Sequence, residues 1–340
     1  MDKVFFIGGP GNISGSTVEG LLENGYEVAI LKRSPNTNPI FEGKVTFYLG
    51  DRANPDGIKK ALDDFNPNTV IDFVGFQPEH IDQIASLLGQ GLTQYVFVST
   101  VDVYGYPLSR IPMRERDQFA EPNSPYAAGK RAAEELLIKK QEEGLPATIV
   151  RPIYSFGIST GMLSFFAWKG MQFQVPRIRK GMPVLVPGDG QTLLHTSVAY
   201  NTGLMIAEIL MAPGKTVGKS YTCGHETPIT FDEYMRLVGS VVGKEPELVH
   251  VPIDAMLSID SEEIRQSYLT TLARYNTCFS IQAFKEDFPD FKWERSLEDG
   301  VKEYVDHGDQ NGVFSDPGKE IYEDRLIRAW RECLSGFHVK

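Results

Sequence analysis

The first 150 residues alternate short apolar runs with segments in which apolar residues recur at helical spacing. The apolar runs show little alternation with polar residues, which is typical of parallel strands buried on both faces. They predict strands at Lys3–Ile7, Glu27–Leu31, Val45–Leu49, Thr69–Phe73, Tyr95–Ser99 and Ala147–Arg151. Helices are predicted between them at Ile13–Asn24, Asp56–Phe65, His80–Leu92 and Tyr126–Glu143. This repeated order of strand and helix predicts an α/β fold, a Rossmann-type doubly wound parallel sheet.

The pattern changes after Arg151-Pro152, where glycine and proline become frequent. We expect residues 1–154 to form the sheet domain, with parts of 190–225 returning to it, and residues 155–340 to form a smaller C-terminal region over the carboxyl edge of the sheet. Two helices are predicted there, at Ser197–Met211 and Thr230–Val242. A last helix is predicted with Asp316 as N-cap and Pro317 at its first position. Its apolar stripe, which should dock on the body, is Tyr322, Leu326, Trp330 and Cys333.

The composition excludes several classes of protein. The 340 residues include 34 Lys+Arg and 45 Asp+Glu, and the net charge of −11 disfavours nucleic acid and anionic membrane surfaces as partners. No apolar run reaches the roughly 18 residues of a membrane span, and the run near residue 5 is too short for the core of a signal peptide. The cysteines Cys223, Cys278 and Cys333 are widely spaced and show no metal-ligand pattern. We therefore expect a cytoplasmic protein with reduced thiols and no metal site.

A glycine-rich turn at residues 8–15 follows the first predicted strand and precedes the first predicted helix. In this position, backbone N–H groups and the positive end of the helix bind a pyrophosphate, and glycines let the backbone approach it closely. With three-residue spacing the motif is Gly9-x-x-Asn12-x-x-Gly15, so an asparagine, which tolerates left-handed backbone angles, replaces the middle glycine. The cofactor-binding residues predicted here are Gly9, Gly11, Asn12, Ile13 and Gly15.

The end of the second predicted strand distinguishes between the two nicotinamide dinucleotides. An acidic residue there would bind the ribose hydroxyls of NAD, but this chain has Lys32 and Arg33. Two cations can pair with a 2′-phosphate, so NADP(H) is favoured, while NAD(H) stays open. Asp51 is placed to accept hydrogen bonds from the adenine amino group, and Arg52 and Val74 complete the predicted cofactor contacts.

Tyr126 and Lys130 lie at positions i and i+4 of a predicted helix, so they share one face. A phenol with its ordinary pKa of about 10 is a poor proton shuttle at neutral pH, and a neighbouring ammonium favours the phenolate. Thr100 follows the fifth predicted strand at the carboxyl edge of the sheet, where its hydroxyl can bind a reacting oxygen. Thr100, Tyr126 and Lys130 are therefore the predicted catalytic residues.

Together these segments resemble the extended short-chain dehydrogenases/reductases, the NAD-dependent epimerase/dehydratase family. The segments that carry the resemblance are the glycine turn, Thr100–Gly105, Tyr126-x-x-x-Lys130, Arg151-Pro152 and, less strongly, Pro187–Gly190 and His195. The resemblance implies that Tyr126 is the acid/base, and that Lys130 binds the nicotinamide ribose and lowers the Tyr126 pKa. It also implies hydride exchange between the nicotinamide and a carbinol carbon. Family members commonly form homodimers through two helices per subunit, which here are His80–Leu92 and Tyr126–Glu143.

Two departures from the family pattern bear on the substrate. The related sugar-nucleotide 4,6-dehydratases carry Thr-Asp-Glu where this chain has Thr100-Val101-Asp102, so a standard 4,6-dehydratase is disfavoured. Asp102 stays a candidate auxiliary acid or base. The arginine that sugar-nucleotide enzymes carry before the histidine is replaced by Gln191, which weakens the case for a nucleotide diphosphate. The candidate substrate contacts are Asp102, Phe156, Gln191 and His195.

Two further groups of residues have a structural interpretation. Glu134 and Glu135 are expected to be acids on a helix surface. The aromatic residues near the start of the C-terminal region either line an apolar substrate cleft or pack that region, and both interpretations stay open; they are Phe165, Phe166, Trp168 and Phe173.

The leading hypothesis is a NADP(H)-dependent oxidoreductase or epimerase acting on a small carbonyl or secondary alcohol substrate, with a sugar-derived substrate left open. The alternative is a non-catalytic dinucleotide-binding protein with a regulatory or redox-sensing role. An RNA-binding role, known for some family members with variant glycine turns, is disfavoured by the net charge of −11.

Overall fold

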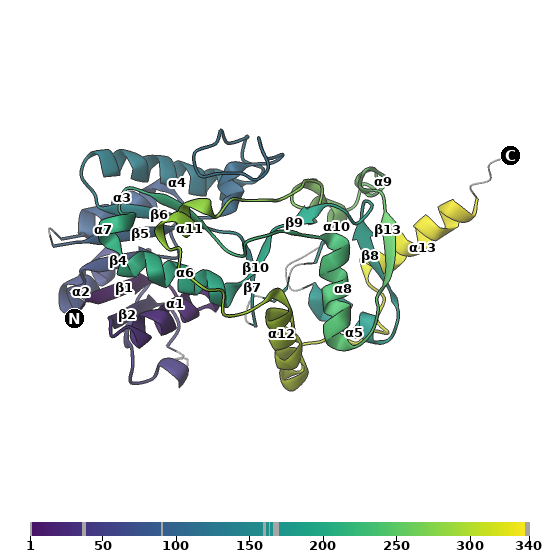
Figure 1. Ribbon diagram of the computed structural model, residues 1–340, viewed down its shortest axis with the longest axis horizontal. Coiled ribbons are helices and arrows are strands. Elements are labelled where there is room, and N and C mark those ends of the chain that lie inside the picture. The colour runs from purple at the N-terminus through teal and green to yellow at the C-terminus, as the bar shows by residue number, and fades with distance from the viewer. Residues whose placement is uncertain are drawn as a thin grey trace.

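A seven-stranded sheet lies at the centre of the larger part of the computed structural model (Figure 1). The structure describes residues 2–35, 39–89, 91–158, 161–162, 164–165 and 170–336. Every pairing in this sheet is parallel, in the order β11-β6-β5-β4-β1-β2-β3. The strands are β1 (Lys3–Ile7), β2 (Glu27–Lys32), β3 (Thr46–Leu49), β4 (Thr69–Asp72), β5 (Gln94–Val98), β6 (Ala147–Pro152) and β11 (Ser220–Cys223). The predicted α/β class with a doubly wound parallel sheet is confirmed.

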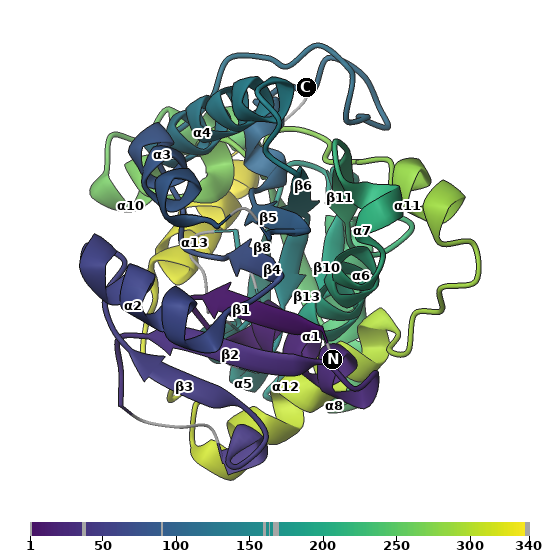
Figure 2. The ribbon, with the colours of Figure 1, turned by 90° about the vertical axis from the view of Figure 1, so that its left-hand side faces the viewer.

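Helices cover both faces of the sheet because its strands are apolar on both sides (Figure 2). One face carries α1 (Asn12–Glu23), α6 (Ala199–Met211), α7 (Pro213–Thr216) and α11 (Gln282–Asp287). The other face carries α2 (Pro55–Phe65), α3 (Pro78–Leu87) and α4 (Pro125–Glu142). Alternate residues of β1 serve the two sides, with Phe6 packed under α1 and α6 and Phe5 packed under α2.

The strand predicted at Tyr95–Ser99 and the helix predicted at His80–Leu92 both end earlier in the structure, for local reasons. The strand ends at Val98 as β5, and the short 3-10 helix η2 (Val101–Tyr104) follows after two residues. Thr100 Oγ1 caps η2, since it accepts the Asp102 N–H at 3.2 Å. Helix α3 ends at Leu87, since the backbone at Leu88 is extended. Neither change moves Thr100 from the carboxyl edge of the sheet.

A second apolar core lies beside the carboxyl edge of the sheet, to the right in Figure 1. Three pairs of short strands belong to this part: β7 (Tyr154–Phe156) with β10 (Thr196–Val198), β8 (Pro183–Pro187) with β13 (Glu247–Val251), and β9 (Leu193–Leu194) with β12 (Ile229–Thr230). Its helices are α5 (Met171–Arg179), α8 (Phe231–Val242), α9 (Ile253–Leu257), α10 (Glu262–Arg265) and α12 (Leu297–Asn311). The remaining 3-10 turns are η1 (Pro39–Phe41) and η3 (Tyr268–Thr270).

Of the aromatic residues predicted either to line a substrate cleft or to pack the C-terminal region, Phe165 belongs to this second core. The ring of Phe165 lies 4.4 Å from the ring of Phe231, centroid to centroid, and is buried. Phe166 and Trp168 lie outside the described residues.

The last helix, α13 (Tyr322–Ser335), begins at Tyr322 and not at Pro317 as predicted. The Asp316 carboxylate accepts the Gly318 N–H at 2.8 Å and closes a separate turn, while Asp324 accepts the Ile321 N–H at 2.8 Å and caps the helix. The first turns of α13 dock through buried Leu326 and Ile327, and its outer end projects from the body (Figure 1).

The helices expected to form a dimer interface use their apolar residues within the subunit. Ile81, Ile84, Ala133 and Leu137 are buried against the sheet of their own chain. An ion pair joins α3 and α4, since Lys140 Nζ lies 2.6 Å from an Asp82 carboxylate oxygen. The homodimer stays a prediction.

Within the described ranges, no helix is long and apolar enough to cross a membrane. The same residues contain no cluster of three or more His, Cys, Asp or Glu side chains that could hold a metal ion. All three cysteines are free thiols; Cys223 is buried in β11 and Cys333 is exposed on α13.

Candidate active site

The glycine-rich turn joins β1 to α1 at the carboxyl edge of the sheet. Gly8 and Gly9 have φ of +91° and +108°, in the left-handed region that favours glycine. A Cβ on Gly8 would lie 2.7 Å from Val74 Cγ1, so the turn also needs a residue without a side chain. The Gly11 N–H donates to Ser14 Oγ at 2.7 Å at the start of α1. The turn thus presents its backbone and a helix N-terminus to a ligand, as a pyrophosphate site requires.

The glycines that this geometry requires are Gly8 and Gly9, whereas Gly15 is not constrained. A Cβ on Gly15 would meet no atom within 4 Å. The buried position in the first turn of α1 belongs to Ser14, whose Oγ would lie 2.8 Å from a Cβ on Gly9. Asn12 packs instead at Gly157, where a Cβ would lie 2.9 Å from Asn12 Cγ. The two sterically constrained glycines therefore begin directly after the apolar strand that ends at Ile7, one residue before the predicted spacing, and the cofactor contacts of Gly9, Asn12 and Gly15 stay predictions.

A pocket of about 940 Å³ opens between this turn and the ends of β2 and β3. It brings together six of the residues predicted to bind the cofactor: Gly9, Lys32, Arg33, Asp51, Arg52 and Val74. The Lys32 ammonium lies 4.3 Å from the centroid of the Phe47 ring, and Arg33 is exposed. Asp51 accepts the Ala53 N–H at 2.8 Å. The cationic end of β2 therefore faces the same space as the glycine turn.

Arg52 is held in this pocket by protein contacts. Its Nη1 lies 2.6 Å from the buried Asp72 carboxylate, and its Nη2 donates to the His80 carbonyl at 2.8 Å. Asp72 also accepts the Tyr95 hydroxyl at 3.2 Å. Arg52 Nε is buried and has no hydrogen-bond partner among the described residues, so its N–H is available to donate to a ligand.

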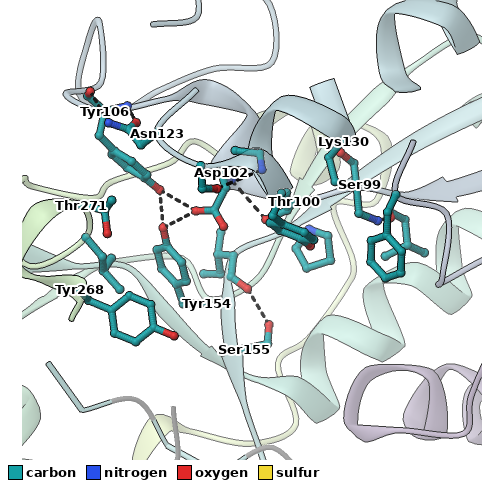
Figure 3. Close-up of a pocket in the computed structure, with 18 of the residues that line it drawn as sticks. Ser99, Thr100, Asp102, Tyr106, Asn123, Lys130, Tyr154, Ser155, Tyr268 and Thr271 are labelled. Carbon is teal, nitrogen blue, oxygen red and sulfur yellow. Dashed lines mark hydrogen bonds between the residues drawn. The ribbon is translucent and has the colours of Figure 1, made fainter. Parts of the chain in front are cut away.

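A second pocket, of about 810 Å³, lies at the carboxyl ends of β5 and β6 (Figure 3). Thr100, Tyr126 and Lys130 all line it, so the fold brings the three predicted catalytic residues together. Ile13 lines the same pocket, and Phe76 lines both pockets. The two spaces therefore meet at Phe76, and together they follow the carboxyl edge of the sheet.

Lys130 is buried and turned toward the sheet. Its Nζ donates to the Val98 carbonyl at 2.6 Å and lies 4.8 Å from the centroid of the Phe76 ring and 6.0 Å from that of Tyr126. Burial lowers the pKa of Lys130 to about 8. Burial also raises the pKa of Tyr126 to about 12, the negative charge of Asp102 adds to this rise, and a hydrogen bond with the Thr100 hydroxyl opposes it. In this arrangement the pKa of Tyr126 is not lowered as predicted, because the Lys130 ammonium faces Val98.

Asp102 forms a cluster with two tyrosines on the side of the pocket away from Lys130 (Figure 3). Asp102 Oδ1 accepts the Tyr154 hydroxyl at 2.7 Å and the Tyr106 hydroxyl at 3.3 Å, and the two hydroxyls contact each other. Burial raises the pKa of Asp102, while hydrogen bonds from Tyr154, Tyr106 and Thr100 oppose the rise. Tyr106 and Tyr154 were not predicted, since no motif marks them.

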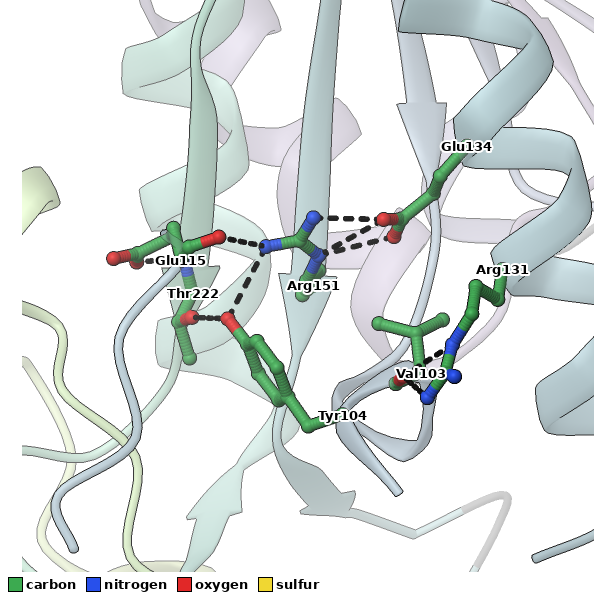
Figure 4. A network of polar contacts seen from close by, with 7 residues as sticks. All are labelled: Val103, Tyr104, Glu115, Arg131, Glu134, Arg151 and Thr222. Atoms are coloured by element: carbon green, nitrogen blue, oxygen red, sulfur yellow. Dashed lines mark hydrogen bonds and ion pairs between the residues drawn. The ribbon is translucent and has the colours of Figure 1, made fainter. Parts of the chain in front are cut away.

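Arg151 anchors α4 to the sheet beneath this pocket (Figure 4). Its Nη2 and Nε lie 2.7 and 3.0 Å from the two carboxylate oxygens of Glu134, and both side chains are only 3% exposed. Arg151 Nη1 donates to the Tyr104 hydroxyl at 3.2 Å, which lies 2.9 Å from Thr222 Oγ1. The prediction that Glu134 lies on the surface is wrong, because this side of α4 faces β6; Glu135 is exposed. Burial opposes the charge of Arg151, but the Glu134 carboxylate more than offsets this and raises the pKa of the guanidinium.

The sequence model of the NAD dependent epimerase/dehydratase family matches residues 4–194. The chain belongs to this family. The match begins in β1 and ends in β9, so it includes the glycine turn, Thr100, Tyr126 and Lys130. No curated protein sequence matches the chain.

Solved structures of similar fold include two epimerases and a dehydratase. The UDP-glucose 4-epimerase of Thermotoga maritima, with UDP-glucose, is 18% identical at a TM-score of 0.67, over 91% of this chain and 99% of its own. The UDP-glucose 4-epimerase of Thermus thermophilus, in complex with NAD, is 21% identical at a TM-score of 0.67, over 91% and 99% of the two chains. The dTDP-glucose 4,6-dehydratase of Bacillus anthracis, also with NAD, is 18% identical at a TM-score of 0.71, over 94% and 100%. At these identities the likeness shows a shared fold.

Three of the four candidate substrate contacts predicted from the sequence do not line either of these two pockets formed by the described residues. His195 is fully buried: its Nε2–H donates to the His225 carbonyl at 2.9 Å, and its Nδ1 accepts the Phe279 N–H at 2.9 Å. Phe156 is buried in the second core, and Gln191 lies at an exposed turn. The structure therefore gives these three side chains structural or surface positions, and of the four candidates only Asp102 lines the pocket that holds Thr100, Tyr126 and Lys130.

The burial of His195 should make the protein less stable in mild acid. Burial lowers the pKa of His195 from 6.5 to about 4, so below pH 6.5 the unfolded chain binds a proton that the folded protein does not. Stability is therefore lost as the pH falls from 6.5 toward 4, by about 2 kcal/mol at pH 5. Urea unfolding at pH 7 and pH 5 should show a smaller loss for His195→Gln than for the wild type. Equal losses in the two proteins would contradict a neutral, structural His195.

Proposed function

We propose that this protein is a nicotinamide-dinucleotide-dependent oxidoreductase or epimerase that exchanges hydride with a carbonyl or secondary alcohol substrate. The observation that carries the proposal is the convergence of Thr100, Tyr126 and Lys130 on one pocket that meets the glycine-turn pocket at Phe76. Membership of the epimerase/dehydratase family supports it.

The residues present fit a dinucleotide lying across the two pockets. The glycine turn offers backbone N–H groups and a helix N-terminus for the pyrophosphate. Each pocket also holds a buried polar atom without a protein partner among the described residues, Arg52 Nε in one and Ser99 Oγ in the other. A bound dinucleotide supplies or accepts the hydride at its nicotinamide ring.

The chain's own residues would handle the proton and the substrate oxygen. With a pKa of about 12, Tyr126 carries its proton at neutral pH, which is the form that donates to the oxygen of a carbonyl under reduction. Thr100, which lines the same pocket as Tyr126, would position that oxygen. Lys130 lies one helical turn along α4 with its ammonium 6.0 Å from the centroid of the Tyr126 ring, where it would bind the ribose of the nicotinamide.

Within this reaction class we propose that the protein is not a standard 4,6-dehydratase. Val101 is fully buried and carries no acid at the first of the two acidic positions of those enzymes. The shared fold of the Bacillus anthracis dehydratase does not bear on this distinction, since the fold supports both chemistries. Nicotinamide absorbance separates the two remaining reactions: a reductase consumes NADPH in proportion to product, whereas an epimerase regenerates its cofactor and shows no net change.

We further propose that NADP(H) is the preferred cofactor. Lys32 and Arg33 both line the pocket beside the glycine turn, and β2 carries no acid at its carboxyl end. The two similar structures with NAD show that relatives of this fold bind the other cofactor, so the preference rests on the residues of this chain.

Replacing Arg33 by alanine should weaken NADPH binding by about 10-fold and change NADH binding little, because a charge-assisted hydrogen bond to the 2′-phosphate is lost. Fluorescence titration of both cofactors measures the two dissociation constants. Arg116→Ala removes an exposed arginine from the 104–120 loop and serves as the control. Tighter binding of NADH than of NADPH by the wild type would overturn the NADP(H) preference, and failure to bind either would overturn the proposed function.

A further inference from the structure

The charges of the substrate pocket are few and are kept apart. Among the described residues that line it, Asp102 is the only carboxylate and Lys130 the only cation. Lys130 is committed to the Val98 carbonyl and to the aromatic rings at the cofactor end. The groups that face the Asp102 carboxylate are hydroxyls, and in the described part of the chain no basic side chain is paired with it.

The Asp102 carboxylate retains capacity to accept a hydrogen bond from a ligand. A carboxylate offers about four lone-pair sites, and the hydroxyls of Tyr106, Tyr154 and Thr100 use at most three of them. Asp102 is only partly exposed, so a donor could reach it only from within the pocket. Its position is fixed by the two tyrosines, and Tyr106 is in turn held by Asn123, whose side chain hydrogen-bonds both the N–H and the carbonyl of Tyr106.

Asp102 also lies next to the place where the reacting oxygen would sit. Its backbone N–H donates to Thr100 Oγ1 at 3.2 Å, and its charge raises the pKa of Tyr126. A substrate oxygen between Thr100 and Tyr126 would therefore place the neighbouring carbon of the substrate toward Asp102.

We propose that this pocket selects uncharged hydroxy-carbonyl compounds, or the corresponding diols, through a hydrogen bond from the hydroxyl beside the reacting carbon to Asp102. The inference rests on the proposed function and names its substrate class. A buried carboxylate without a basic partner repels a phosphate or a nucleotide diphosphate at short range. Three tyrosine rings complete a wall suited to an uncharged ligand: Tyr106, Tyr154 and Tyr268.

The test uses the full chain with NADPH and matched pairs of substrates that differ only in a phosphate group. The pairs are uncharged aldoses and hydroxyketones of three to six carbons, from glyceraldehyde upward, and their phosphate monoesters. The measured quantity is the ratio of kcat/KM for the uncharged compound to kcat/KM for its ester. We expect the wild type to prefer the uncharged member, and Asp102→Asn to reduce this ratio by about 10-fold, because the amide removes the charge and keeps an acceptor.

Two further variants separate charge from general damage to the fold. Tyr154→Phe removes a donor but leaves the carboxylate charged, so the preference for the uncharged member should persist. Glu135→Gln removes an exposed carboxylate from α4 and should leave the ratio unchanged.

Preference for the phosphate esters would overturn the inference, as would a lack of response to every uncharged hydroxy-carbonyl while NADPH binds. Either result would leave the cofactor part of the proposed function standing. Absence of NADPH and NADH binding would instead overturn the proposed function itself.

Discussion

Replacing Tyr126 by phenylalanine should lower kcat by at least about 100-fold while cofactor binding persists. The substitution removes only the hydroxyl that would transfer the proton. The ring, whose centroid lies 6.1 Å from that of Phe76, can keep its place where the two pockets meet. Steady-state kinetics give the change in kcat, and fluorescence titration gives the dissociation constant of NADPH.

Tyr48→Phe is the matched control, since Tyr48 lies on β3 and its hydroxyl binds Asp64 at 2.6 Å, outside both pockets formed by the described residues. It should leave kcat unchanged. Retained activity in Tyr126→Phe would contradict the proposed acid. A wild type that binds the dinucleotide tightly but turns over no substrate would favour the non-catalytic redox-sensing alternative.

Replacing Glu134 by glutamine should destabilise the protein by about 3 to 5 kcal/mol. In this variant the Arg151 side chain, which is 3% exposed, stays buried and charged. The neutral amide of glutamine cannot compensate that charge. The free energy of unfolding in urea measures the loss. The neighbouring Glu135→Gln provides the control and should change stability by no more than about 0.5 kcal/mol.

A double variant tests whether the loss comes from an uncompensated charge. Combining Glu134→Leu with Arg151→Met removes both charges and should recover part of the stability lost in Glu134→Gln. If Glu134→Gln and Glu135→Gln cost the same, the buried ion pair does not stabilise α4. In that case the rigid placement of Tyr126 and Lys130 would need another cause.

The sheet and the catalytic trio were predictable from local patterns. Apolar runs such as Lys3–Ile7 have no competing helical periodicity, and the predicted bounds of β1 match the structure. The i and i+4 spacing puts Tyr126 and Lys130 on one side of α4, and parallel strands end at a common edge, so Thr100 had to lie near them.

The features that were missed depend on partners distant in the sequence. Glu134 is buried because Arg151 reaches it from β6, and a helical pattern alone does not reveal such a partner. The contact between Tyr106 and Tyr154 joins residues 48 positions apart, and no spacing rule brings them together. The predicted start of α13 was wrong because Asp316 and Asp324 both offer a carboxylate that can cap a helix. Only the docking of the helix on the body selects Asp324.

The edge strand β11 makes the two cores dependent on each other during folding. It pairs with β6 only after the chain has passed through the second core and returned through α6. Helix α6 packs closely on α1, since a Cβ on Gly203 would lie 2.3 Å from the Ile13 carbonyl oxygen. A fragment ending near residue 154 would leave the β6 edge unpaired and the α1 face of the sheet without α6, which favours aggregation. During synthesis the glycine turn and α1 therefore lack the packing of α6 until more than two hundred residues have left the ribosome.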